Sequence, residues 1–270
     1  MIKLIVCDLD GTLLNGQHCI APLSKQVLQM LNNQGVEVML ATGRHYQDVY
    51  LLAQQLAIPT RLITSNGARV HNAKSELIYE NHIPPELVGE ILHLSAGFEV
   101  HRNLYQQDLW LVEEPNEPLL NIHHSSGFGY RLTDFSRLDP HHIDKFYFNA
   151  AHEKLEPLQA LLQQRFGDQL YITFTTETYL EVMNQGVSKG RALEKVLAQK
   201  GIASADVMAF GDGLNDVDML NLVGHPVVMA NAHPQLITQV PHAPRAKANE
   251  DDGVARYLID YFALDLVHTP

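Results

Sequence analysis

The sequence predicts an α/β protein in which helices cover a parallel sheet and a second domain is inserted within the chain. Two textures of apolar pattern support this prediction: continuous apolar runs near both ends, and shorter, aromatic-rich or alternating runs in the middle. Continuous runs are typical of strands buried on both faces of a parallel sheet, and alternating runs of half-exposed antiparallel strands. A length of 270 residues accommodates two such domains.

The first texture predicts the parallel sheet and its helices. One helical pattern has Pro22 near its start and Gly35 after its end, and another begins near Ser188 and ends before Gly201. Alternation of strands and helices indicates βαβ units. The strands are expected at residues 4–7, 36–41, 62–64 and 207–210.

The second texture predicts a mostly antiparallel sheet with two helices, near residues 86–96 and 153–166. The texture changes near Pro84-Pro85 and again near Gly186. We therefore expect a discontinuous core, residues 1–82 and 186–270, that is interrupted by a cap domain of residues 83–185. The cap strands are expected at residues 98–101, 109–112, 145–148, 171–174 and 179–182.

Composition excludes several classes of protein. The 19 basic and 31 acidic residues give a net charge of −12, which argues against nucleic acid or an anionic membrane as a partner. No apolar stretch is as long as a membrane span, and Cys7 and Cys19 form no CxxC pair. We therefore expect a soluble cytoplasmic protein.

The 15 histidines are scattered along the chain. The pairs His123-His124 and His141-His142 lack a metal-ligand frame such as HExxH. We expect these histidines to be solvated or to cap helices and turns.

Four of the buried strands are followed by small and polar residues. Parallel strands place their carboxyl ends at one edge of the sheet, where ligands bind. These segments, although far apart in the sequence, are therefore expected to meet in one crevice. They are Asp8-Leu9-Asp10-Gly11-Thr12, Thr42-Gly43-Arg44, Ser65-Asn66-Gly67 and Gly211-Asp212-Gly213-Leu214-Asn215-Asp216.

The crevice would bring together Asp8, Asp10, Asp212 and Asp216. Carboxylates that lie this close together repel one another, unless a cation balances their charge or their pKa values rise. Oxygen-rich surroundings without thiolates favour a hard ion, Mg²⁺ before Ca²⁺. A single Asp after a strand is more often a turn or helix cap, and Asp216 fits the start of a following helix as well as it fits a metal site.

Anion binding is predicted at the same edge. Glycines in these loops let backbone N–H groups approach a ligand closely, and such groups bind phosphate. Lys189 is expected in the first turn of a helix, where the helix dipole disfavours a cation, so it either is solvated or reaches the crevice. Arg44 either grips an anion or lies on the surface.

These segments resemble the four motifs of the haloacid dehalogenase superfamily of phosphatases. Asp8-Leu9-Asp10-Gly11-Thr12 is similar to the first motif, Thr42 within Ala41-Thr42-Gly43-Arg44 to the second, Lys189 to the third, and Gly211–Asp216 to the fourth. The long insertion between Thr42 and Lys189, together with Ser65-Asn66-Gly67-Ala68, resembles the Cof-like subgroup. The resemblance implies a Rossmann-like core with an inserted α/β cap.

The resemblance also implies a role for each residue. Asp8 would attack phosphorus and form an aspartyl-phosphate, and Asp10 would act as the general acid and base. Mg²⁺ would be held by Asp8, Asp212 and the backbone carbonyl of Asp10, and Asp216 would support the metal's water shell or orient Lys189. The phosphate-binding groups would come from Leu9, Thr42, Gly43, Lys189 and Asn215. Apart from the resemblance, we expect substrate contacts from Arg44, Asn66, Gly67 and Glu181.

The predicted function is a Mg²⁺-dependent phosphatase of small phosphorylated metabolites, such as sugar phosphates or pyridoxal phosphate. A sugar phosphomutase or phosphotransferase uses the same motifs and stays open as an alternative. A non-catalytic phosphometabolite sensor would not need the Asp8/Asp10 pair. A dinucleotide-binding dehydrogenase would carry GxGxxG after the first strand, where this chain has DxDGT. The sequence predicts no oligomeric state.

Overall fold

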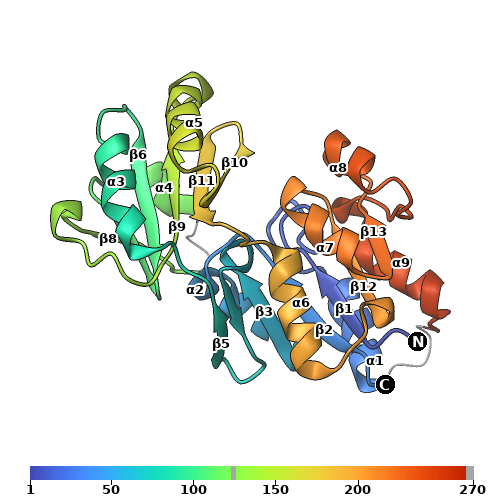
Figure 1. The fold of residues 1–270 in the computed structure, drawn as a ribbon. Coiled ribbons are helices and arrows are strands. Elements are labelled where there is room, and N and C mark those ends of the chain that lie inside the picture. The colour runs from blue at the N-terminus through green and yellow to red at the C-terminus, as the bar shows by residue number, and fades with distance from the viewer. Residues whose placement is uncertain (123–125, 266–270) are drawn as a thin grey trace. The chain divides into compact units, whose positions relative to one another are not determined.

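The computed structural model describes residues 1–122 and 126–265, and the chain divides into two compact units (Figure 1). The core unit contains residues 1–43 and 50–78 and the chain from residue 188 onward. The cap unit contains residues 44–49 and 79–187. The short segment 44–49, which directly follows the Thr42-Gly43 pair, is therefore grouped with the cap and not with the residues on either side of it.

The core unit is built on a seven-stranded sheet in the order β13-β12-β1-β2-β3-β4-β5. β1 pairs in parallel with both β2 and β12, and the pairs β2/β3 and β12/β13 are also parallel. Only toward one edge does the sheet turn antiparallel, where β3 meets β4. The strands are β1 Leu4–Cys7, β2 Glu37–Ala41, β3 Thr60–Thr64, β4 Arg69–His71, β5 Leu77–Glu80, β12 Val207–Gly211 and β13 His225–Val228.

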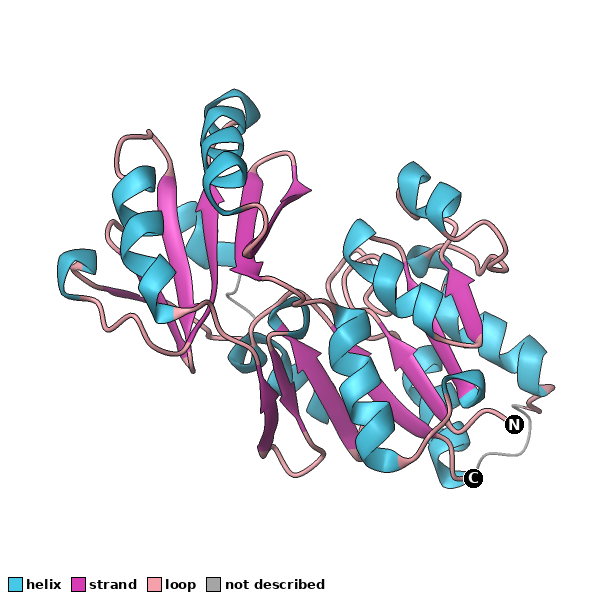
Figure 2. Cartoon of the chain, viewed as in Figure 1, coloured by secondary structure: helices cyan, strands magenta, loops and turns pink. Residues whose placement is uncertain are grey.

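Helices cover this sheet in two groups, α1 packed with α9 and α6 packed with α7 (Figures 1 and 2). Burial on both faces explains the unbroken apolar runs, since every residue of β1 and β12 is buried. The core helices are α1 Pro22–Asn33, α6 Lys189–Lys200, α7 Val217–Leu222, α8 Pro234–Gln239 and α9 Gly253–Phe262. Helix α2, Tyr46–Gln54, passes from the cap unit into the core unit.

The strand order places a switch point between β1 and β12. From β1 the chain adds β2 and then β3 on one side, and β12 and then β13 lie on the other side. Loops that leave the carboxyl ends of β1 and β12 therefore diverge and open a crevice at this point. The α/β fold class and the parallel sheet that the sequence predicts are confirmed.

The cap unit has a six-stranded sheet in the order β10-β11-β9-β6-β7-β8. All its pairings are antiparallel except the one between β7 and β8. The strands are β6 His101–Gln106, β7 Leu109–Val112, β8 Tyr130–Leu132, β9 Ile143–Asn149, β10 Leu170–Thr176 and β11 Tyr179–Asn184. The helices are α3 Pro85–Ser95, α4 Glu117–Ile122 and α5 His152–Phe166.

The two faces of the cap sheet differ in chemistry. On one face, side chains such as Leu104 and Phe146 pack with α3 and α5 into an apolar core. On the other, Tyr105, Trp110 and Tyr147 form an aromatic cluster with Phe128. Alternation along each strand separates these sets, which is the pattern of a sheet with one apolar and one mixed face.

One predicted cap strand is wrong. Residues 98–100 are not a strand, because the Phe98 N–H bonds the Ser95 carbonyl and the Val100 N–H bonds the Phe98 carbonyl in a turn after α3. The strand begins at His101 and runs through the polar residues that follow. Turn hydrogen bonds at the end of the helix thus outweigh the β propensity of Phe98 and Val100.

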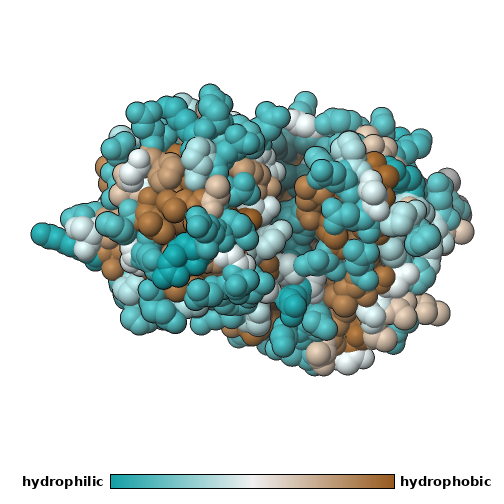
Figure 3. Space-filling model, turned by 45° about the horizontal axis from the view of Figure 1, so that its top comes forward, coloured by the Kyte–Doolittle hydropathy of each residue, from teal (hydrophilic) through white to brown (hydrophobic). Residues whose placement is uncertain are grey.

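Hydrophilic residues cover most of the face drawn in Figure 3, and apolar residues gather there in separate patches. Within the described residues, no helix is long and apolar enough to cross a membrane. His123 and His124 lie outside the described residues.

Candidate active site

The site begins where β1 ends. The Asp8 N–H bonds the Phe210 carbonyl of β12 at 3.1 Å, so the sheet ladder continues to this residue. The chain then turns, and the Asp8 and Leu9 carbonyls accept N–H groups from Leu13 and Leu14. The Asp8 side chain is buried, and its Oδ1 lies 2.6 Å from the Lys189 ammonium nitrogen.

Lys189 is the first residue of α6, and its side chain is fully buried. The Ser188 hydroxyl caps the helix by accepting the Arg191 N–H at 3.1 Å, which fixes where the helix begins. The Lys189 Nζ donates to Asp8 Oδ1 at 2.6 Å and to Asp216 Oδ1 at 2.7 Å. From the sequence, Lys189 is either solvated or reaches the crevice. In the structure it reaches the carboxylates.

Asp216 organises the loop after β12. Its Oδ1 accepts from Lys189, and its Oδ2 accepts the N–H groups of Asp212 and Gly213 at 3.0 and 2.9 Å. Both oxygens of this buried carboxylate are therefore engaged by the protein. Asp216 holds the lysine and the loop that carries Asp212 in one arrangement.

Thr12 is a site residue to which the sequence analysis gave no role. Its hydroxyl donates to Asp212 Oδ1 at 2.7 Å and so orients that carboxylate. Gly11 lies between them with a φ of +76°, and a Cβ there would be 2.2 Å from Asp212 Oδ2. The close approach of the two loops thus requires glycine at this position.

Asn231 was also missed. Its side-chain amide donates to the Gly11 carbonyl at 2.7 Å. Asn231 follows β13, so the rule that polar residues after parallel strands meet at one edge would have found it, had β13 been recognised.

Three carboxylates of this site form a compact cluster. One oxygen each from Asp8, Asp212 and Asp216 lies within 4.8 Å of the others. Burial raises the pKa of Asp8 well above its usual range; Asp216 and Asp212 raise it further, and Lys189 opposes them. Burial likewise raises the pKa of Asp212, which the Thr12 hydrogen bond partly offsets. Mutual repulsion in a buried place is what a bound cation would relieve.

The donors fit a hard divalent cation. The cluster offers only oxygen ligands, which suit Mg²⁺. Burial alone would lower the pKa of Lys189, but Asp216 and Asp8 outweigh burial and raise it, so the lysine is a fixed cation. One ammonium does not neutralise three carboxylates, so the cluster can bind a further cation.

The Ser65-Asn66-Gly67 turn lies between the loop after β2 and the loop after β12. All three residues have positive φ, and a Cβ at Gly67 would be 2.2 Å from the Ser188 carbonyl oxygen. The Asn66 N–H bonds the Thr42 carbonyl at 3.0 Å, and the Asn66 Oδ1 accepts from the Asn215 side chain at 2.9 Å. This turn therefore lies against the start of α6 and against both neighbouring loops.

The other residues predicted for the core site take varied positions. The Leu9 and Thr42 side chains are buried, and a Cβ at Gly43 would be 2.9 Å from Asn66 Oδ1. The Asp10 side chain is 45% exposed, and its Oδ1 lies 3.6 Å from His18 Nδ1. Among the described residues, its carboxylate is not part of the compact cluster.

Two predicted substrate contacts belong to the cap unit. Arg44 Nη1 lies 3.5 Å from Asp48 Oδ2. Glu181, on β11, accepts from the buried Lys145 Nζ at 2.6 Å. The same ammonium lies over the rings of Tyr105 and Tyr147, on the mixed face of the cap sheet.

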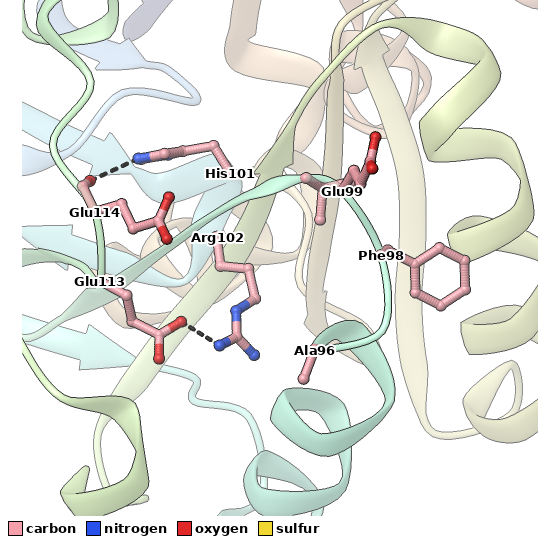
Figure 4. Close-up of a pocket in the computed structure, with 8 residues that line it drawn as sticks. Ala96, Phe98, Glu99, His101, Arg102, Glu113 and Glu114 are labelled. Atoms are coloured by element: carbon pink, nitrogen blue, oxygen red, sulfur yellow. Dashed lines mark hydrogen bonds and ion pairs between the residues drawn. The ribbon is translucent and has the colours of Figure 1, made fainter.

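A hollow of about 530 Å³ also lies within the cap unit (Figure 4). Arg102 pairs with Glu113 at its wall, and the His101 ring bonds the Glu114 carbonyl at 2.8 Å. None of the residues predicted from the sequence for chemistry lines it. Its lining is Ala96, Phe98, Glu99, Val100, His101, Arg102, Glu113 and Glu114.

A parallel sheet with an inserted antiparallel domain, and a carboxylate–lysine cluster at its switch point, defines the class of haloacid dehalogenase-like hydrolases. Comparison with known proteins agrees. The sequence profile described as haloacid dehalogenase-like hydrolase matches residues 5–258. The chain belongs to this family, and the resemblance that its motifs indicate is confirmed.

Individual relatives and solved structures show which members of the family the chain is similar to. It is 37% identical over 258 residues to an HMP-PP phosphatase of Cronobacter sakazakii, covering 96% of this chain and 95% of that one. It is 36% identical to a putative phosphatase of Haemophilus influenzae, covering 97% and 98% of the two chains. A haloacid dehalogenase-like hydrolase from Bacteroides thetaiotaomicron superposes with a TM-score of 0.88 at 27% identity, covering 97% and 100%. The chain is thus an enzyme, a phosphatase of small phosphorylated compounds.

Proposed function

We propose that the protein is a Mg²⁺-dependent phosphatase that works through an aspartyl-phosphate on Asp8. The observation that supports this most directly is the Lys189 ammonium, which bonds both Asp8 and Asp216 beside the Asp212 carboxylate. A buried cation next to surplus carboxylates suits a site that receives a metal ion and a phosphoryl group together.

Each residue has a proposed task. Asp8 attacks phosphorus, and Asp10 gives a proton to the leaving oxygen and later takes one from water. The exposure of Asp10 suits a group that exchanges protons with solvent. Lys189, the Thr42 hydroxyl, the Asn215 side chain and the N–H groups of Leu9 and Gly43 bind the phosphoryl oxygens.

Asp8, Asp212 and the Asp10 carbonyl would hold Mg²⁺, which supplies charge neutralisation and polarises the phosphoryl oxygens. Because both oxygens of Asp216 are engaged, its proposed task is to position Lys189 and the Asp212 loop behind these ligands. Thr12 has the same kind of task for Asp212.

For the organic part of the substrate we propose contacts with Asn66, Gly67, Arg44 and Glu181. The mixed face around Glu181 combines aromatic rings with a buried ion pair. These side chains are buried, so the rings and Lys145 hold the Glu181 carboxylate in one orientation, and a fixed charged side chain selects hydrogen-bonding groups. HMP-PP, which is named in several relatives, is the first compound to test.

The test is a phosphate-release screen over phosphorylated metabolites, sugar phosphates and p-nitrophenyl phosphate, with and without Mg²⁺. We expect release that depends on Mg²⁺ and is highest for a few small compounds. No release from any member with Mg²⁺ present would refute the proposal. An isomerised or transferred phosphate without free phosphate would instead indicate a mutase or transferase.

A further inference from the structure

A second group of metal-ligating side chains lies within the cap unit. Glu80 ends β5, a strand whose last two residues already belong to the cap unit, and His82 lies two residues further on. His142 directly precedes β9. One ligand atom from each of these three residues lies within 4.8 Å of the others. From the sequence, the His141-His142 pair is expected to be solvated or to cap a helix or turn, because it lacks a metal-ligand frame such as HExxH. The partners His82 and Glu80 lie about sixty residues away and form no local motif with His142.

The spacing of the ligand atoms fits a tetrahedral ion. His82 Nε2 lies 3.1 Å from Glu80 Oε2 and 3.4 Å from His142 Nδ1. Bonds of 2.0–2.1 Å in a tetrahedron place neighbouring ligand atoms about 3.3 Å apart. The two imidazole rings are perpendicular, at 88°, and their centroids lie 5.1 Å apart.

A buried carboxylate orients the central ligand. Asp144 lies on β9 and is fully buried, and its Oδ1 is 3.0 Å from His82 Nδ1. A histidine that donates one ring N–H to a carboxylate presents the lone pair of its other nitrogen, here Nε2, to a metal ion. This carboxylate–histidine pair is the usual support of a zinc-binding histidine.

The loop that carries His142 is also held in place. The Gln106 side-chain amide donates to the carbonyls of Asp139 and His141, each at 2.8 Å, and the Gln107 N–H bonds the His142 carbonyl. Hydrogen bonds therefore hold the backbone of His142 and of the residues before it in place. This lowers the entropic cost of ordering the His142 ring when an ion binds.

Charge favours a cation here. Asp144 Oδ1 lies 3.0 Å from His82 Nδ1, and Glu80 Oε2 lies 3.1 Å from His82 Nε2, so two carboxylates face this ring. Their negative charge favours a cation at the cluster.

We propose that Glu80, His82 and His142 form a metal site of the cap unit for Zn²⁺ or a similar borderline ion. Two imidazoles and one carboxylate are the ligands that such ions choose, whereas the all-oxygen cluster of the core unit suits Mg²⁺. Glu80 and His142 are exposed, so the fourth position opens to water or to a further ligand. The site does not depend on the proposed catalytic roles.

The protein and its variants are treated with EDTA and then dialysed. ZnCl₂ is titrated into each of them in a calorimeter, with Mg²⁺ present to occupy the oxygen cluster of the core unit. His142→Ala, His82→Ala and Glu80→Gln should each weaken one Zn²⁺-binding event at least about tenfold. His141→Ala is the matched control, because His141 pairs with Asp139 next to the site and should leave the affinity unchanged.

A second measurement does not depend on any variant folding. The ring signals of His82 and His142 in the NMR spectrum of the unaltered protein should shift together as Zn²⁺ is added, while those of His93 and His141 stay in place. Two results would overturn the proposal: ring signals of His82 and His142 that do not shift with Zn²⁺, or a Zn²⁺ affinity that is unchanged in both His→Ala variants. The cluster would then be a proton-bridged network.

Discussion

Two buried lysines, one in each unit, meet their carboxylates in different ways. In the core unit, Lys189 bonds Asp8 and Asp216, and Asp212 lies beside them. In the cap unit, Lys145 bonds Glu181 and lies over two tyrosine rings. The first group gathers three carboxylates around one ammonium, whereas the second joins an ion pair to aromatic rings.

The difference agrees with the roles that we propose for the two places. A buried cluster of carboxylates is unfavourable by itself and becomes favourable when a cation binds, which suits the proposed catalysis. An ion pair next to aromatic rings supplies a fixed shape and polarity, which suits the proposed recognition of substrate.

The largest expected effect separates chemistry from stability in the core group. Asp8→Asn should lower turnover at least about a thousandfold, because an amide is not a nucleophile toward phosphorus. It should not unfold the protein, since Asp216 still pairs with Lys189 and one of the repelling charges is gone. Phosphate release and thermal unfolding measure the two effects, and normal turnover would remove Asp8 as the nucleophile.

The next prediction compares the lysines directly. Lys189→Met and Lys145→Met each leave buried carboxylate uncompensated, and each should lower the free energy of unfolding by about 3 kcal/mol. Only Lys189→Met should also abolish turnover of p-nitrophenyl phosphate, a substrate with a small leaving group.

The double variant Lys145→Met/Glu181→Gln is the control for this comparison. It removes both charges of the ion pair together, so it should regain much of the lost stability in denaturant unfolding. Equal loss of turnover in the Lys145 and Lys189 variants would contradict the division between the two places.

Metal addition tests the surplus charge. At one hundred times its dissociation constant, Mg²⁺ should raise the free energy of unfolding by about 2.7 kcal/mol. Asp212→Asn should remove this effect in thermal unfolding with and without Mg²⁺, whereas Glu80→Gln should keep it. Stabilisation that persists in Asp212→Asn would place the ion elsewhere.

The smallest expected effect concerns the turn that supports Lys189. Gly67→Ala should lower the free energy of unfolding by about 2 kcal/mol and reduce turnover, because its φ is +103° and its Cβ would press on the Ser188 carbonyl. Gly35→Ala is matched: its φ is +90°, but nothing lies within 4 Å of its Cβ, so only about 1 kcal/mol of backbone strain is expected. Equal stability and full turnover in both variants would show that the turn does not position the lysine.

The core unit was the more predictable of the two. Its strands are unbroken apolar runs, so the sequence placed β1 at its observed bounds and put each polar loop at a strand end. The rule for parallel sheets then predicted that Asp8, Asp10, Asp212 and Asp216 meet, and three of these carboxylates form the cluster. The position of Lys189 was left open. The short strands β4, β5 and β13 were not predicted, and Asn231 was missed because β13 begins with His225 and Pro226, which are not typical of a buried strand.

The cap unit was less predictable because its contacts depend on register. Glu181 opposes Tyr147 in the sheet, and Lys145 opposes Tyr105, pairings that no local pattern encodes. The assignment of residues 44–49 to this unit is of the same kind, since His45 stacks on Phe128 and bonds the Gln107 carbonyl. Such long-range partners become visible only once the strands are aligned.

The Lys145–Glu181 pair also constrains how this enzyme can diverge. Losing either charge alone leaves the other stranded in a buried place, whereas replacing both together costs little. Descendants in which one of the two residues has changed are therefore expected to differ at both positions, after passing through a stabilised background that tolerates the single change. Reconstructed ancestors along such lineages would reveal the order of the two substitutions.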